Sequence, residues 1–289
     1  MIESVCRELK HRSVPFLWLD NSHLPKSVPF AYLLGGGLEF QIDGRWVSVP
    51  GDASIYHRLG FSAFESEPDF TPEEKDFVEA ECATALQTML NHHQGLVVNP
   101  PHRSGSNASK PYQASLFGEF GFRTPETLVT NLPEAAKAFY EAFDGQVIYK
   151  SISYVRSIVQ PMKAEDLDRL DTLINCPIQL QEKIEGFDVR VHVIGEEVFP
   201  SRIETEQSDY RFDKTASVTA WELPDPWSER CWRLARSLGF HLTGIDLRFT
   251  PQGEVVCFEA NPSPAFTWYE ARTEQPLSAA LCDLLMAKG

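Results

Sequence analysis

The sequence predicts a mixed α/β (α+β) protein made of two or three subdomains around one cleft. The chain has 289 residues, more than one ordinary hydrophobic core requires. Hydrophobic residues make up 43% of it, so a well-buried interior is available and wholesale disorder is not expected. Short alternating runs typical of strands and amphipathic runs typical of helices follow one another along the chain.

The charge balance limits the kind of partner. The formal net charge is −15, and an acidic surface disfavours a nucleic-acid groove, so no nucleic-acid partner is expected. An anionic ligand would need a locally positive site, and a metal ion is one way to provide it.

The cysteines favour a reducing compartment. Six are scattered without a C-x-x-C pair, which predicts reduced thiols in a cytoplasmic protein rather than a disulfide framework or a zinc site. The first residues are too charged for a signal peptide. No apolar run reaches the roughly 18 residues that a membrane span needs, so no membrane partner is expected.

The N-terminal region is predicted to begin with strands and turns. Strands are expected over 14–19, 30–34, 38–42 and 46–49. Asp43-Gly44 is a hairpin signal between the last two. The triplet Gly35–Gly37 predicts a turn and not a phosphate-binding loop, because no helical pattern follows it.

A capped helix and a polar break follow. Thr71, Pro72 and Glu74 predict a helix start with a capping box, and the helix should continue to Asn91. The polar stretch 99–106 then marks a domain boundary. We expect an N-terminal domain over 1–101, a central subdomain over 102–184 and a C-terminal subdomain over 185–289.

The rest of the chain alternates between helices and strands. Helices are expected over 108–119, 133–143, 166–174 and 226–238, and at the C-terminus from Leu277 to Leu285. Strands are expected over 146–151, 178–184, 187–194 and 198–203, with a hairpin formed by 244–249 and 254–259. In the strand at 187–194, three valines should face one side while Asp188, Arg190 and His192 face the other.

This last hairpin carries the strongest chemical signal. Glu259 and Asn261 are two residues apart on one strand and share a face. A two-residue connection at Pro251 and Gln252 would place Asp246 on that face, diagonal to Glu259, although a bulge at Gly253 would shift the register. Three oxygen ligands suit Mg²⁺, with Mn²⁺ as an alternative. The competing interpretation is an ordinary surface hairpin with its carboxylates in water.

The surrounding residues give this hairpin a family likeness. It resembles the last two strands of ATP-grasp ligases, whose magnesium ligands are an Asp on one strand and a Glu and an Asn on the next. The resemblance implies an ATP-grasp fold, with an N-terminal pre-ATP-grasp domain and two subdomains that clamp ATP. It also implies that Lys110 and Lys150 contact the ATP phosphates. Taken alone, each lysine would more often be a solvated surface charge, but their order ahead of a metal-type hairpin favours the phosphate-binding role.

The same resemblance assigns further positions. The segment Gln181, Glu182, Lys183 and Ile184 is similar to the hinge that meets adenine through backbone groups at a strand edge, with Glu182 helping to read the amino group. Asp188 matches a position near the ribose. Arg211 resembles a catalytic arginine that contacts the phosphates or the acyl intermediate. Arg190 is either a second catalytic arginine or part of a structural ion pair.

Shorter motifs narrow the likeness to ligases that macrocyclise microviridin-type peptides, the graspetides, with the glutamate-adding ligases as relatives. These motifs lie at 54–58, 99–101, 124–131 and 261–264, with Trp268 and Glu270. Two features depart from the wider ATP-grasp pattern. Residues 151–158 lack the glycines of a phosphate-covering loop, and the sequence after Asn261 is Pro-Ser-Pro-Ala where a glycine is usual.

Three functions follow as hypotheses. In the first, an acyl phosphate formed with ATP is attacked by an amine or hydroxyl, which closes an ester or amide ring in a ribosomally made (RiPP) precursor peptide with a leader segment. In the second, the same chemistry adds an amino acid to a small molecule or a protein terminus. The third is a non-catalytic nucleotide- or peptide-binding module. The family likeness also suggests a homodimer.

Overall fold

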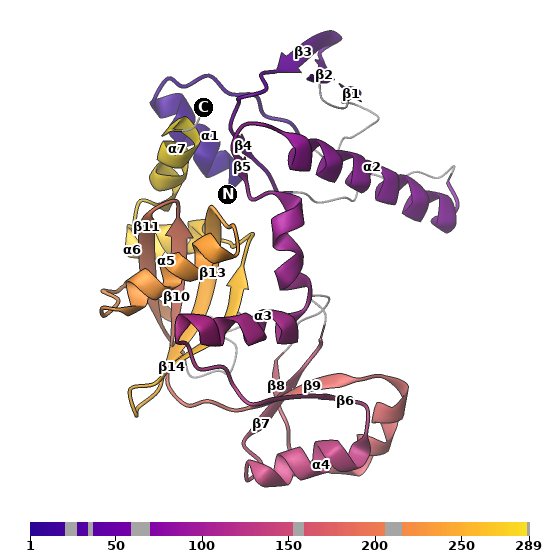
Figure 1. Cartoon of the computed structure of the whole chain (residues 1–289), viewed down its shortest axis with the longest axis vertical. Helices are drawn as coiled ribbons and strands as arrows, with labels where there is room; N and C mark the ends of the chain where they lie inside the picture. The colour runs from indigo at the N-terminus through magenta and orange to yellow at the C-terminus, as the bar shows by residue number, and fades with distance from the viewer. Residues whose placement is uncertain (21–27, 34–36, 59–69, 153–158, 206–215, 288–289) are drawn as a thin grey trace. The chain divides into compact units, whose positions relative to one another are not determined.

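The computed structural model of the chain describes residues 1–20, 28–33, 37–58, 70–152, 159–205 and 216–287 (Figure 1). The chain divides into two compact units, Met1–Arg103 with Pro276–Gly289, and Ser104–Gln275. The expected boundary after residue 101 lies two residues before this division. The last helix, expected within 185–289, packs in the first unit instead, and the proposed division at 184/185 falls inside the second unit.

In the first unit, two helices from opposite ends of the chain pack together. α1 (Ile2–His11) buries Val5 and Leu9, and Cys282 of α7 (Leu277–Ala287) contacts the carbonyl of Val5. Arg12 forms an ion pair with Asp283. The sequence-based prediction misses α1, although Val5 and Leu9 have helical i, i+4 spacing. The predicted strand at 14–19 is wrong, since the backbone there is irregular.

The remaining elements of this unit largely follow the prediction. β1 (Phe30–Tyr32), β2 (Leu38–Ile42) and β3 (Arg45–Val49) form an antiparallel sheet in that order, while β4 (Ile55–Tyr56) pairs in parallel with β5 (Val97–Val98). Asp43 and Gly44 both have positive φ, 50° and 75°, as a two-residue hairpin turn requires. α2 (Pro72–His92) starts with the predicted capping box between Thr71 and Glu74. Gly35 and Gly36 lie outside the described residues.

The second unit contains a four-stranded sheet in the order β6-β9-β7-β8. Its strands are β6 (Thr127–Thr130), β9 (Ile178–Glu182), β7 (Val147–Lys150) and β8 (Gln160–Pro161). α4 (Pro133–Ala142) and η4 (Ala164–Asn175) pack against it. The helix predicted at 166–174 is present, but η4 is a 3-10 helix and not an α-helix. Leu167, Leu170 and Leu173 are spaced three apart, which matches three residues per turn.

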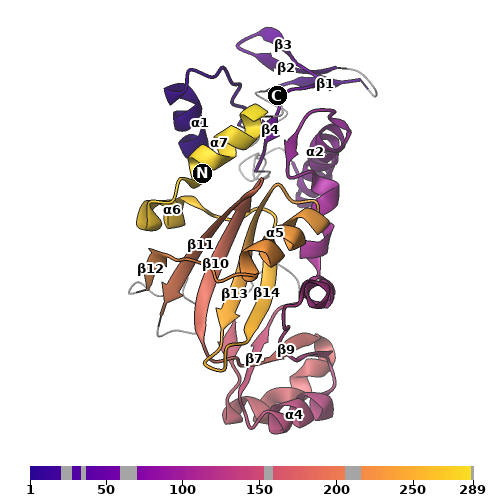
Figure 2. The ribbon, with the colours of Figure 1, turned by 60° about the vertical axis from the view of Figure 1, so that its left-hand side comes forward.

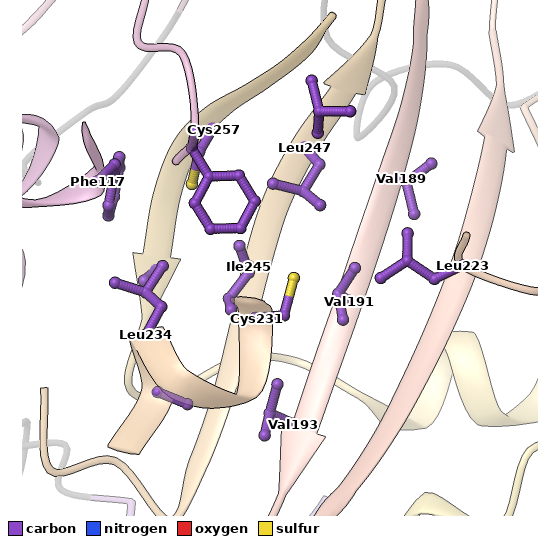
Figure 3. Close-up of a cluster of buried hydrophobic side chains, with 14 of the residues drawn as sticks. Phe117, Val189, Val191, Val193, Leu223, Cys231, Leu234, Ile245, Leu247 and Cys257 are labelled. Carbon is purple, nitrogen blue, oxygen red and sulfur yellow. The ribbon is translucent and has the colours of Figure 1, made fainter. Parts of the chain in front are cut away.

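A five-stranded antiparallel sheet forms the other part of this unit (Figure 2). Its order is β12 (Ser217–Ala220), β11 (Glu197–Glu204), β10 (Phe187–Ile194), β13 (Leu242–Phe249) and β14 (Val255–Asn261). α5 (Trp227–Ser237) covers one face. The predicted alternation of β10 is confirmed, because Val189, Val191 and Val193 enter the core shared with α5 (Figure 3). β12 and α6 (Thr267–Thr273) were not predicted.

A short helix packs against the edge of this sheet. α3 (Lys110–Phe117), shorter than the predicted 108–119, continues into η3 (Gly118–Phe120). Phe117 is buried in the core of the five-stranded sheet (Figure 3), and Phe122 belongs to the same core. α3 therefore packs with β14, although the sequence places it in the central subdomain.

Among the described residues, no helix combines the length and the apolar character that crossing a membrane would require.

The turn between β9 and β10 yields a stability prediction. Gly186 has φ of +142°, and a Cβ there would lie 2.1 Å from the backbone oxygen of Phe249. Gly253 also has positive φ, +85°, but a Cβ there meets nothing within 4 Å. We expect Gly253→Ala to cost about 1–2 kcal/mol through backbone strain alone. Gly186→Ala should cost roughly 1–3 kcal/mol more, because of the added clash. Urea unfolding measures both, and equal losses would contradict this packing.

Candidate active site

A β-bulge in β14 decides which side chains reach the face of the sheet opposite α5. Val255 and Cys257 point into the core, and unbroken alternation would send Glu259 and Asn261 the same way. The register with β13 shifts between Asp246 and Leu247, since Leu247 pairs with Cys257 but Asp246 pairs with Glu259. Phe258 is the extra residue. Beyond it the alternation is reversed, so that Ala260 enters the core and Glu259 and Asn261 face the other side.

The three predicted metal ligands share this face. Asp246 lies directly opposite Glu259, so their Cβ atoms are about 5 Å apart. The predicted diagonal placement of these two residues is therefore wrong. The turn that contains Gly253 moves the register by one residue, since Phe249 pairs with Val255, and the bulge at Phe258 moves it by one more. Asn261, which pairs with Gly244, is the diagonal neighbour of Asp246.

The donor set fits a magnesium ion. Two carboxylates and an amide offer oxygen ligands, which Mg²⁺ prefers. The Oδ1 of Asn261 accepts a hydrogen bond from the Ser263 N–H at 2.8 Å, which fixes the amide and leaves a second lone pair. Within the described part of the chain, no cluster of three or more His, Cys, Asp or Glu side chains could hold a metal. A site here therefore depends on the amide of Asn261 as third ligand.

Arg190 holds Asp246 in place. Its Nε lies 2.6 Å from Oδ1 of Asp246, and its Nη2 donates to Oδ2 at 3.0 Å. The two side chains are only 10% and 26% exposed, so water screens the pair less than it would at the surface. Gly244 makes room for this pair, because a Cβ there would lie 2.3 Å from Nη1 of Arg190. Of the two roles left open for Arg190, the ion pair is the one that the structure contains.

Lys150 is a buried cation at the end of β7. Its side chain is 8% exposed, and its Nζ donates to Oε1 of Gln181 at 3.0 Å. The other end of the Gln181 amide donates to Oγ1 of Thr127 at 2.9 Å. Burial lowers the pKa of Lys150 to about 8. Gln181, predicted for its backbone, thus acts here through its side chain.

Two charged side chains also shift the pKa of Lys150. Burial has the largest effect on the pKa of Lys150. The positive charge of Lys110 lowers this pKa further, and the negative charge of Glu259 raises it. Lys110 is the first residue of α3. The two predicted phosphate-binding lysines and one predicted metal ligand therefore belong to one electrostatic cluster, although they come from three elements far apart in the sequence.

The predicted adenine hinge is only partly free. The Lys183 N–H donates to the Gln146 carbonyl at 2.8 Å, and the Ile184 carbonyl accepts from Nη1 of Arg248 at 2.8 Å. β9 lies between β6 and β7, so the expected strand edge begins only after Glu182. Within the described residues, no hydrogen bond is made by the Lys183 carbonyl or the Ile184 N–H. These two groups are the acceptor and donor left for a ligand.

The carboxylate of Glu182 has protein partners. It accepts hydrogen bonds from Nη2 of Arg123 at 2.7 and 2.9 Å and from the Glu126 N–H at 2.7 Å. Arg123 in turn pairs its backbone with β14, through the Val255 carbonyl at 3.2 Å and the Cys257 N–H at 2.9 Å. Glu182 therefore connects the hinge to β14.

Asp188 is held by Arg248. Nε and Nη2 of Arg248 donate to the two carboxylate oxygens of Asp188, both at 2.8 Å. The side chains are 15% and 20% exposed. This bidentate pair orients Asp188 on the same sheet face as Arg190.

Two predicted features cannot be placed. Arg211 lies in 206–215, outside the described residues, and so does 153–158, most of the segment that lacks the loop glycines.

Arg123 and Gln113 were not predicted as functional residues. Gln113 of α3 is 1% exposed and makes two hydrogen bonds with the backbone of Ala260, between Glu259 and Asn261. Arg123 contacts Glu182, 59 residues away in the sequence. No local sequence pattern indicates Gln113 or Arg123, because each contact depends on a partner that is distant in the sequence.

Comparison with known proteins gives matches among solved structures. No protein-family model matches the chain, and no curated protein matches it. The ATP-grasp ligase PsnB, complexed with minimal precursor, Mg and ADP, superimposes with a TM-score of 0.84 at 27% identity, over 99% of this chain and 93% of that chain. Macrocyclase MdnC, bound with precursor peptide MdnA from Microcystis aeruginosa MRC, gives a TM-score of 0.88 at 22% identity, over 99% and 95%.

A third structure agrees with these two. A Chryseobacterium gregarium RiPP-associated ATP-grasp ligase, in complex with ADP and a leader and core peptide, gives a TM-score of 0.85 at 22% identity, over 100% of this chain and 93% of that chain. The structural match thus defines the class as an ATP-grasp ligase, and the predicted fold is confirmed. Within that class the chain resembles the macrocyclising, RiPP-associated ligases, as the sequence motifs predict.

The lowered pKa of Lys150 predicts a pH effect on stability. Lys150 titrates at about 8 in the folded protein and near 10.4 in the unfolded chain. Between these values the unfolded chain binds more protons, so stability rises with pH. We expect the free energy of unfolding of the wild type, without nucleotide, to rise from pH 8 to about 10 relative to Lys150→Met.

The control is Lys137→Met on α4, where the lysine side chain is 61% exposed. This variant should follow the wild-type curve in denaturant titrations at each pH. Parallel curves for the wild type and Lys150→Met would contradict a desolvated charge at Lys150.

Proposed function

We propose that this chain is an ATP- and Mg²⁺-dependent ligase that closes ester or amide macrocycles in a ribosomally made precursor peptide. One observation carries the proposal: the charges of Lys110 and Glu259 both act on Lys150, and Glu259 shares its sheet face with Asp246 and Asn261. Two cations for phosphates next to three oxygen ligands for a metal are what binding of a metal–triphosphate requires.

The nucleotide base is proposed to bind at 181–184. The Lys183 carbonyl can accept from an amino group, and the Ile184 N–H can donate to a ring nitrogen. Arg123 and Arg248 hold the two ends of this segment through Glu182 and the Ile184 carbonyl. Asp188, fixed by Arg248, is proposed to accept from a ribose hydroxyl. Glu182 then acts by shaping the hinge, since its carboxylate already has partners.

The phosphates are proposed to lie between the lysines and the carboxylates. Asp246, Glu259 and Asn261 would hold Mg²⁺, which when bound would neutralise phosphate charge. Arg190 keeps the Asp246 carboxylate oriented and charged before the ligand arrives. Lys110, Lys150 and the catalytic candidate Arg211 stabilise negative charge on the transferred phosphoryl group.

The proposed reaction has two steps. A side-chain carboxylate oxygen of the peptide attacks the γ-phosphorus, the bond to the β–γ bridging oxygen breaks, and ADP leaves. An amine or hydroxyl of the same peptide then attacks the acyl carbon of the acyl phosphate, loses its proton, and displaces inorganic phosphate. Each ring therefore removes one water from the peptide mass while one ATP becomes ADP and phosphate.

The partners follow from this chemistry. We propose a precursor peptide with a leader segment as substrate. MdnC is bound with a precursor peptide, and the Chryseobacterium gregarium ligase with a leader and core peptide. A cytoplasmic location is supported by six cysteines that are all free, five of them buried. A homodimer remains a proposal drawn from the family likeness.

Mass spectrometry tests this function. The purified chain is incubated with ATP, Mg²⁺ and candidate precursor peptides rich in Thr, Ser, Asp and Glu. It is expected to release ADP and to lower the mass of its substrate peptide by one water for each ring. Glu259→Gln should reduce ADP release more than about 100-fold, because it removes a ligand of the metal. Glu254→Gln is the matched control, since Glu254 belongs to the same hairpin but is 56% exposed.

The outcomes separate the competing functions. An unchanged precursor mass despite ATP binding would rule out the peptide substrate. A gain in mass of a co-substrate would identify a ligase that adds an amino acid. No ADP release with any substrate would leave a non-catalytic binding module.

A further inference from the structure

Gln113 makes an unusual contact for a helix side chain. It lies in the middle of α3 with 1% of its surface exposed. Its Nε2 donates to the Ala260 carbonyl at 2.8 Å, and its Oε1 accepts from the Ala260 N–H at 2.9 Å. One amide therefore satisfies both backbone groups of a residue that is 147 positions away.

The place of this contact gives it significance. β14 is the edge strand of its sheet, so the backbone groups on its outer side have no neighbouring strand. Gln113 supplies to Ala260 the hydrogen bonds that a neighbouring strand would supply. Ala260 lies between Glu259 and Asn261, just after the bulge at Phe258. Before the bulge, the backbone of Arg123 makes hydrogen bonds with Val255 and Cys257 on the same outer side. The extra residue is thus bracketed by hydrogen bonds on both sides.

Gln113 lies on the same face of α3 as Lys110. Lys110, Gln113 and Phe117 are spaced three and four residues apart, so they lie along one helix face. Phe117 is fully buried in the sheet core, which shows that this face points at β14. Lys110 stands one turn before Gln113, and its charge reaches Lys150.

We infer that Gln113 is a positioning residue that fixes the spacing between Lys110 and the Glu259–Asn261 segment, and so sets the affinity for a magnesium-bound nucleotide. The inference rests on the proposed function. The inference extends that function by assigning a role to a side chain that itself touches neither metal nor phosphate.

The chemistry of the side chain makes the role specific. Only an amide of this length offers a donor and an acceptor side by side to the carbonyl and the N–H of one residue. Gln113→Met keeps the size and flexibility but leaves the Ala260 N–H and carbonyl without partners. Gln113→Glu keeps the acceptor for the Ala260 N–H and, when ionised, loses the donor for the carbonyl.

The test compares binding with stability. Wild type, Gln113→Met and Phe117→Leu are titrated with ADP at several Mg²⁺ concentrations by calorimetry, and their unfolding temperatures are recorded. Phe117→Leu is the matched control, because it weakens the same helix–sheet packing two turns from Lys110. We expect Gln113→Met to weaken Mg²⁺-dependent ADP binding at least tenfold and to raise the Mg²⁺ concentration for half-maximal binding. Phe117→Leu should lower the unfolding temperature while changing binding less than twofold.

Each result decides the matter. Equal binding by both variants when the wild type binds Mg²⁺-ADP would overturn the inference and leave the proposed function standing. Absence of Mg²⁺-dependent ADP binding by the wild type would overturn the proposed function and the inference with it. If Gln113→Met does not fold, Gln113→Glu is measured in its place against the same control and the same tenfold expectation.

Discussion

The site depends on one extra residue in an edge strand. Phe258 breaks the alternation of β14, and the break lets a strand that buries Val255 and Cys257 present Glu259 and Asn261 on its opposite face. Without it, two polar ligands would point into a hydrophobic core, at a desolvation cost that no partner there could offset. Bulges of this kind re-aim side chains next to active sites. The bulge therefore links the packing of the sheet to the chemistry of the candidate metal site.

The charges around this bulge are arranged before any ligand binds. Asp246 is held by Arg190, Asp188 by Arg248 and Glu182 by Arg123, so each predicted acidic group other than Glu259 has an arginine partner. Lys150, by contrast, is buried against an amide and near another cation, which lowers its pKa. A cation kept in that environment is destabilising for the empty protein and favourable for binding a triphosphate. Preorganised charge of this kind is the usual source of stabilisation in phosphoryl transfer.

Sequence patterns identified the elements that local chemistry determines. The capping box of Thr71 and Glu74, the turn at Asp43-Gly44 and the alternation of β10 depend on neighbours in the sequence, and the structure contains all three. The D…E-x-N hairpin also placed Asp246, Glu259 and Asn261 on one face. The bulge at Phe258, the contact of Gln113 with Ala260 and the link from Arg123 to Glu182 could not be read in this way. Each depends on a partner brought near by tertiary packing, and the residues involved carry no local signal.

The most direct measurement is the location of a divalent cation in a crystal of the chain grown with Mn²⁺ and a non-hydrolysable ATP analogue. We predict an anomalous peak about 2.1 Å from side-chain oxygens of Asp246, Glu259 and Asn261, with phosphate oxygens completing its shell. A peak elsewhere would contradict the account. So would a nucleotide whose phosphates lie away from the sheet face that carries Asp246, Glu259 and Asn261.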